Sequence, residues 1–184
     1  KMLAQRLGYL YINTGAMYRS VAMKAIREGV DADDVEGLAQ IAEQLNILLK
    51  KDGRIYLDGK DVTSAIATLE VSRMSSLVSA VEEVRTAMIK RQQEMGKKSG
   101  VVLEGRDIGT VVFPEAQVKI YLNAGLKERS QRRWLDLKET IPLSQVESEL
   151  ESRDRRDSNR PLSPLKQADD AILIDSTHLT ADEV

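Results

Sequence analysis

An arginine-dense segment, Ser152 to Arg160, carries the side chain best suited to binding phosphate. It reads Ser-Arg-Asp-Arg-Arg-Asp-Ser-Asn-Arg and sets four arginines around two aspartates. The chain has 15 Arg against 12 Lys, and seven of the arginines lie between Arg129 and Arg160. A guanidinium group binds phosphate oxygens through two parallel hydrogen bonds. The bias favours an oxyanion ligand, although i,i+3 and i,i+4 ion pairs on a solvated helix explain the segment equally well.

Two further motifs combine polar side chains with glycine just after an expected strand. Glu104-Gly-Arg-Asp107 offers a carboxylate that could hold Mg²⁺ through water and a glycine that lets backbone approach a ligand. Thr14-Gly-Ala-Met-Tyr-Arg19 sets a hydroxyl, a phenol and a guanidinium at the start of a helix, the end that favours anions. Taken alone, the first could be a turn with a salt bridge and the second a strand-to-helix turn.

The elements that position these motifs alternate between strands and helices. Four short apolar runs predict strands, at 9–12, 101–103, 118–122 and 171–174. Helical periodicity predicts helices at 16–28, at 35–45, at 69–95 in two parts, at 126–138 and from 143 into the arginine-dense segment. Strands that are apolar throughout indicate a parallel sheet buried on both faces, with ligands outside the carboxyl ends of its strands.

A small antiparallel insert interrupts this alternation. Asp52-Gly53 and Asp58-Gly59 are hairpin signals, and they separate three short segments at 47–49, 54–57 and near Val62. We therefore expect a three-stranded meander between the second and third helices.

Composition excludes several classes of function. The 184 residues carry a net charge of -2 and 4% aromatics, which argues against coating duplex nucleic acid or stacking single strands. No cysteine and a single histidine exclude a disulfide framework and a thiolate or His-rich metal site. No apolar run approaches the ~20 residues of a membrane span, so we expect a cytoplasmic protein without nucleic-acid or membrane partners.

The three motifs occur together in the order and approximate spacing of the cytidylate kinases, which the whole chain resembles in their bacterial type. The resemblance implies an α/β, P-loop kinase-like three-layer fold with a mainly parallel central sheet whose first strand lies outside this sequence. It assigns residues 1–14 and 99–184 to the core, residues 15–98 to a monophosphate-binding domain with the antiparallel insert, and about 140–161 to a lid. It also implies a monomeric transferase of pyrimidine metabolism.

The implied reaction is phosphorylation of CMP and dCMP by ATP with Mg²⁺. By resemblance Ser76, Arg85 and Asp107 read cytosine, and Arg153 and Asp157 bind ribose. The residues expected to line the phosphate of CMP are Thr14, Tyr18, Arg19, Arg106 and Arg160. The residues expected to act on the transferring phosphoryl group are Arg106, Arg153, Arg156 and Arg160, with Arg156 as the lid arginine.

Two departures from the family pattern bear on activity. The family's Gly-x-x-x-x-Gly-Lys-Ser/Thr loop is absent, and Lys1 belongs to a helical pattern, so we expect both chain ends to continue outside this sequence and the fragment to be inactive. Position 104 is Glu where many relatives have Asp, so metal contact there is expected only through water. Two other functions stay open: a monophosphate-binding module without turnover, and a P-loop kinase for another acceptor.

Overall fold

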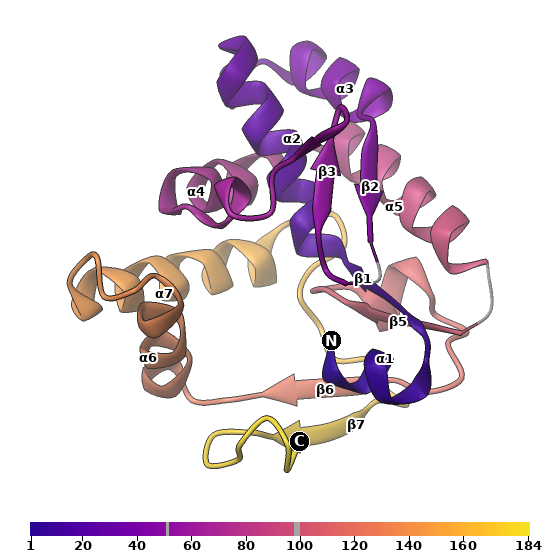
Figure 1. The fold of residues 1–184 in the computed structure, drawn as a ribbon, viewed down its shortest axis with the longest axis vertical. Helices are drawn as coiled ribbons and strands as arrows, with labels where there is room; N and C mark the ends of the chain where they lie inside the picture. Colours follow the sequence, from indigo (N-terminus) through magenta and orange to yellow (C-terminus); the bar gives the residue numbers. More distant parts are fainter. Residues whose placement is uncertain (51, 98–99) are drawn as a thin grey trace. The chain divides into compact units, whose positions relative to one another are not determined.

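The chain divides after Ile108 into two units, residues 1–108 and 109–184, in the computed structural model, which describes residues 1–50, 52–97 and 100–184 (Figure 1). The first unit holds α1 (Met2–Leu7), β1 (Leu10–Asn13), α2 (Thr14–Glu28), α3 (Val35–Gln44), β2 (Ile47–Leu49), β3 (Ile55–Leu57), β4 (Lys60–Asp61), η1 (Ala65–Ala67), α4 (Leu69–Val78), α5 (Glu82–Gly96) and β5 (Val101–Glu104). A π-helical turn, η2 (Ile108–Val112), crosses the boundary. The second unit holds β6 (Ile120–Asn123), α6 (Leu126–Asp136), α7 (Leu143–Asn159) and β7 (Ile172–Asp175).

The predicted α/β class is confirmed, because parallel strand pairs alternate with helices. Strand β1 pairs with β5 and β6 pairs with β7, both in parallel. In the first pair Asn13 lies opposite Glu104, so both strands end at the same edge. The Asn13 side chain then accepts a hydrogen bond from the Ala16 amide at 2.9 Å and caps α2 at its start. This cap explains why α2 begins at Thr14, two residues before the predicted start.

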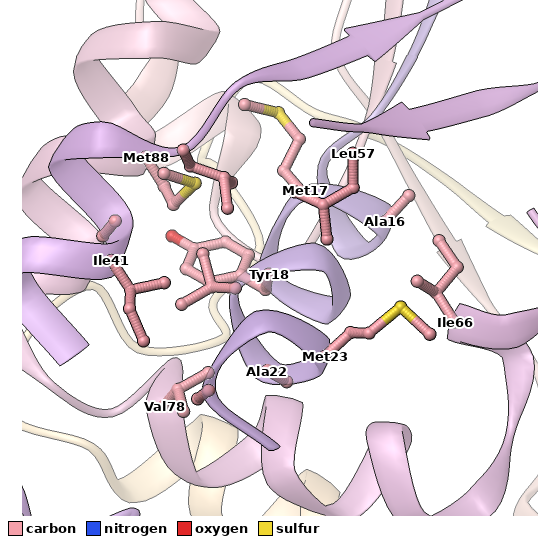
Figure 2. Close-up of a cluster of buried hydrophobic side chains, with 14 of the residues drawn as sticks. Ala16, Met17, Tyr18, Ala22, Met23, Ile41, Leu57, Ile66, Val78 and Met88 are labelled. Carbon is pink, nitrogen blue, oxygen red and sulfur yellow. The ribbon is translucent and has the colours of Figure 1, made fainter. Parts of the chain in front are cut away.

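Helix α2 is the centre of the core of the first unit (Figure 2). It packs against α3, α4, α5 and η1, and small or flexible residues such as Ala16, Met17 and Ala22 are fully buried along it. Ala side chains permit close helix approach, and Met adapts to the remaining gaps. A helix buried on several sides is apolar around much of its circumference. Because α2 is packed in this way, it is a rigid element, and the motif at its N-terminus is held in a fixed position.

The expected antiparallel meander is confirmed as the sheet β2-β3-β4. Its second turn uses Asp58 and Gly59, both at positive φ, as an Asp-Gly hairpin requires. The Lys24 ammonium lies 3.0 Å from the Asp58 carboxylate and joins this turn to α2. The two helices predicted at 69–95 are confirmed as α4 and α5, which are separated by residues 79–81.

The expectation that the apolar strands are buried on both faces is wrong for β6 and β7. Ile120 and Leu122 are 49% and 57% exposed, and Ile172 and Leu173 are 60% and 57% exposed. Within the described residues each of these strands has one strand neighbour, so neither lies in the middle of a sheet. In the part of the chain that the structure describes, no helix has the length and apolar character needed to cross a bilayer.

Candidate active site

The loop after β5 meets the start of α2 at the shared strand edge. The Thr14 hydroxyl donates to the backbone carbonyl of Glu104 at 2.7 Å, so two motifs that are 90 positions apart touch. A Cβ at Gly105 would clash with the Thr14 Oγ1 atom and would come within 2.8 Å of the Ile108 side chain. Glycine is favoured here by the close approach of the Thr14 and Ile108 side chains, whereas the sequence analysis expected it to let backbone approach a ligand.

The Glu104 carboxylate interacts with Tyr11, a residue outside the three sequence motifs. Tyr11 and Asn13 lie on the same face of β1, and the Tyr11 phenol donates a hydrogen bond to Glu104. Burial and the Glu104 carboxylate raise the pKa of Tyr11 well above its ordinary value of 10.0. The Arg19 guanidinium and the Asn13 amide act in the opposite direction but more weakly. Two-residue alternation along the strand was the available signal for this contact.

A buried ion pair joins Arg85 on α5 to Asp107 in the loop after β5. Arg85 is 1% exposed and Asp107 is 6% exposed. Arg85 Nη1 also donates to the Ser79 carbonyl at 3.1 Å, and its guanidinium lies 5.6 Å from the centre of the Tyr18 ring. The Ser79 hydroxyl in turn donates to the carbonyl of buried Ser76 at 3.0 Å. Four of the predicted site residues, namely Tyr18, Ser76, Arg85 and Asp107, thus form one linked group.

Arg85 Nε is a buried donor with no hydrogen-bond partner among the described residues. A buried donor left without an acceptor is costly, and each such group calls for an explanation. An acceptor atom of a bound ligand would satisfy it.

The second unit holds four predicted residues on α7 or at its C-cap. Asp157 lies between two arginines, with Arg160 Nη1 at 3.4 Å and Arg153 Nε at 3.7 Å from its carboxylate oxygens. The side chains of Asp157 and Arg160 are buried. Arg153 and Asp157, four residues apart, lie on one face of α7, and Arg160 is the C-cap residue of the helix in an extended conformation. Arg156 belongs to the last turn of the same helix and is exposed.

Helix α7 is joined to α6 by a further arginine. Arg129 Nη1 lies 2.5 Å from the Asp154 carboxylate, and Arg129 Nε donates to the Ala124 carbonyl at 2.9 Å. The arginine therefore connects the end of β6 to the middle of the arginine-bearing helix. The sequence shows Arg129 among the basic residues but does not indicate its partner.

The remaining predicted residues lie in the first unit. Arg19 is half-buried in the second turn of α2, with its guanidinium folded back toward Gly15, and Arg106 is half-buried in the loop after β5. Glu104 is exposed at the end of β5.

Among residues 1–50, 52–97 and 100–184 no group of three or more His, Asp or Glu side chains could hold a metal ion. One carboxylate and water still suit Mg²⁺, which takes most of its ligands from water and phosphate.

The amino-acid sequence of this chain is similar to those of known proteins. A model of the family described as cytidylate kinase matches residues 1–184. A cytidylate kinase of Geobacter sp. (strain M21) is 48% identical over 190 residues, which cover 100% of this chain and 82% of the relative. One of Syntrophotalea carbinolica is 49% identical over 190 residues, with 100% and 81% covered. A bifunctional pantoate ligase/cytidylate kinase of Synechococcus sp. (strain JA-2-3B'a(2-13)) is 45% identical over 193 residues, covering 100% of this chain and 36% of that protein.

The fold is thus that of a nucleoside-monophosphate kinase, a nucleotide-binding transferase. The chain belongs to the cytidylate kinase family. The family resemblance drawn from the three motifs is confirmed, while the roles of the individual site residues and the division at residues 15–98 stay predictions.

Proposed function

We propose that the protein to which this chain belongs phosphorylates CMP and dCMP with ATP as the donor. The observation that carries the proposal is the buried Arg85–Asp107 pair, in which Arg85 Nε has no acceptor among the described residues. Cytosine offers an exocyclic amine as donor and its ring nitrogen and carbonyl as acceptors. Asp107 would accept from the amine, and Arg85 with Ser76 would donate to the acceptors. An adenine or guanine in this position would leave buried polar groups unpaired.

The phosphate of the acceptor would bind at the N-terminus of α2. Amide groups and the helix dipole favour an anion there, and Arg19 folds its guanidinium toward the first turn of the helix. Thr14, Tyr18, Arg106 and Arg160 would complete the phosphate contacts, as the family resemblance implies. Tyr18 also stacks against Arg85, so it would support the base-reading arginine as well.

The ribose would bind to Arg153 and Asp157 on α7. The Asp157 carboxylate is held between two guanidinium groups, and its oxygens would accept hydrogen bonds from the ribose hydroxyls. Exposed Arg156 would neutralise charge on the transferring phosphoryl group.

The reaction requires positioning rather than a covalent enzyme intermediate. An oxygen of the CMP phosphate would form a bond to the γ-phosphorus as the bond from that phosphorus to the bridging oxygen of ADP breaks. Mg²⁺ bound with ATP supplies charge neutralisation on the phosphates. Glu104, hydrogen-bonded by Tyr11, would orient a water ligand of that ion.

A panel of acceptors tests the proposal. Full-length protein is assayed with Mg-ATP and each of CMP, dCMP, UMP, AMP and GMP, with ADP release coupled to NADH oxidation. We expect kcat/KM for CMP and dCMP to exceed the values for AMP and GMP by at least about 10²-fold, because purines leave the base-reading groups unpaired. Equal rates across the panel would contradict the proposed acceptor. Binding of CMP without ADP release by the full-length protein would indicate a binding module instead.

A further inference from the structure

Ser163 has an unusual backbone conformation beside the arginine-bearing helix. Its φ is 50°, in the left-handed region, and it precedes Pro164. A residue before proline normally adopts an extended conformation, and a non-glycine residue rarely adopts positive φ. Three other described non-glycine residues share positive φ, namely Asp58, Lys138 and Glu139, and all three are exposed. Ser163 is 8% exposed, so its strained conformation is held inside the structure.

The strained residue presents its carbonyl to Arg160. Arg160 Nε donates to the Ser163 carbonyl at 2.6 Å, while Arg160 Nη1 lies 3.4 Å from the Asp157 carboxylate. The Leu165 amide donates to the Asp157 backbone carbonyl at 2.7 Å and closes the segment back onto the end of α7. Two donors of one planar guanidinium thus have fixed directions, which define the orientation of its plane.

We propose that Ser163 is a positioning residue for Arg160. Its left-handed backbone turns the carbonyl toward Nε and thereby holds the guanidinium ready to bind the acceptor phosphate. This inference rests on the proposed function, in which Arg160 contacts the phosphate of CMP. Backbone strain is retained where the surrounding structure enforces it, and it is common where a binding group must be preorganised.

Four variants separate the effect of turning the Ser163 carbonyl from the effect of losing the hydroxyl and from the general effect of a β-branched residue at positive φ. Ser163→Val introduces a β-branched residue that opposes positive φ, so the carbonyl should turn away from Arg160. Ser163→Gly and Ser163→Ala remove the hydroxyl, and Gly also accepts positive φ readily. Lys138→Val is the matched control, because Lys138 has φ 54° and is exposed outside the arginine-bearing helix.

The contact itself is measured by NMR on the wild-type chain without ligand. We expect the Arg160 Nε proton to exchange slowly with solvent and to show a scalar coupling across the hydrogen bond to the Ser163 carbonyl carbon. Ser163→Val should raise that exchange rate at least tenfold, whereas Lys138→Val should leave it unchanged. A fast-exchanging Nε proton in the wild type would overturn the inference, and this measurement does not require Ser163→Val to fold.

The consequence for binding is measured by titrating the same chain with CMP. We expect Ser163→Val to weaken CMP binding about tenfold, Ser163→Gly and Ser163→Ala to stay within threefold, and Lys138→Val to have no effect. In an Arg160→Met background Ser163→Val should add less than twofold. An equal additional loss in that background would overturn the inference, because Ser163 would then act independently of Arg160. If the wild type binds no CMP, the proposed function fails, and the exchange measurement alone decides whether Ser163 orients Arg160.

Discussion

Arg85 and Asp107, 22 positions apart in the sequence, form a buried ion pair between α5 and the loop after β5. The pair unites two residues that we assign to the same base of the acceptor. Each of the two residues also contributes to the stability of the fold, since removal of either leaves the other as an unpaired buried charge. Stability and recognition must therefore be measured separately at this position.

Replacement of one partner should cost both stability and CMP binding. Asp107→Ala leaves Arg85 as an unpaired buried charge, which typically lowers the free energy of unfolding by about 3–5 kcal/mol. We expect CMP affinity to fall more than tenfold, because a charged hydrogen bond contributes about 1.5–3 kcal/mol. Urea unfolding and titration with CMP measure the two effects.

A double replacement separates recognition from folding. Substitution of both partners by apolar residues, as in Arg85→Met with Asp107→Leu, should recover most of the lost stability, because no buried charge remains. CMP binding should stay weak in this variant. Recovery of CMP binding together with stability would show that the pair has only a structural role.

Gly105 should tolerate no side chain while Thr14 keeps its hydroxyl. Gly105→Ala sets a Cβ against the Thr14 Oγ1 atom and the Ile108 side chain, and overpacking of this kind costs about 1–3 kcal/mol. Removal of the hydroxyl in the Thr14→Ala, Gly105→Ala double variant should relieve part of the cost. Thermal unfolding of the two single variants and the double variant measures the coupling, and strict additivity would disprove the contact.

The contribution of Tyr11 to the stability of the folded state should decline at alkaline pH. The pKa of Tyr11 is raised in the folded state, so the folded protein keeps the phenol proton after the unfolded chain loses it above pH 10. This contribution to stability is complete below pH 10 and declines as pH rises toward the folded pKa. Its slope should be less than about 1.4 kcal/mol per pH unit, since Tyr11 is only partly buried.

Urea unfolding of the wild type and of Tyr11→Phe at pH 7, 8, 9, 10 and 11 tests this expectation. The difference in unfolding free energy between wild type and variant should shrink from pH 10 to pH 11 and be constant below pH 9. A constant difference across the whole range would mean that the phenol titrates alike in both states.

The Arg129–Asp154 pair should couple α6 to α7 measurably. A double-mutant cycle with Arg129→Met and Asp154→Asn should give a coupling of about 1 kcal/mol, because the two groups are close and only about a quarter to a third exposed. The matched control is Arg155 with Glu151, whose side chains are 73% and 61% exposed and 3.9 Å apart. Its coupling should be near zero at 0.15 M salt. Equal couplings in both cycles would refute this role for Arg129.

Local sequence signals predicted most of the elements. Gly29, at φ 69°, ends α2 directly after the helix predicted at 16–28, and the two Asp-Gly turns produced the meander. These predictions succeeded because caps and turns depend on a few neighbouring residues. The expected burial of β6 and β7 failed because an apolar run reports which residues prefer to be buried and not what covers them.

By itself, the sequence determined the family, the order of the elements and the three polar motifs, because residue types and spacings carry that information directly. Only the tertiary structure decided the partners: Asp107 for Arg85, Glu104 for Tyr11, and the Ser163 carbonyl for Arg160. The first pair depends on the meeting of Arg85 on α5 with the loop after β5, and the second on the register of β1 against β5. The third depends on a left-handed serine before proline, a conformation that local preference opposes and only the surrounding structure can impose.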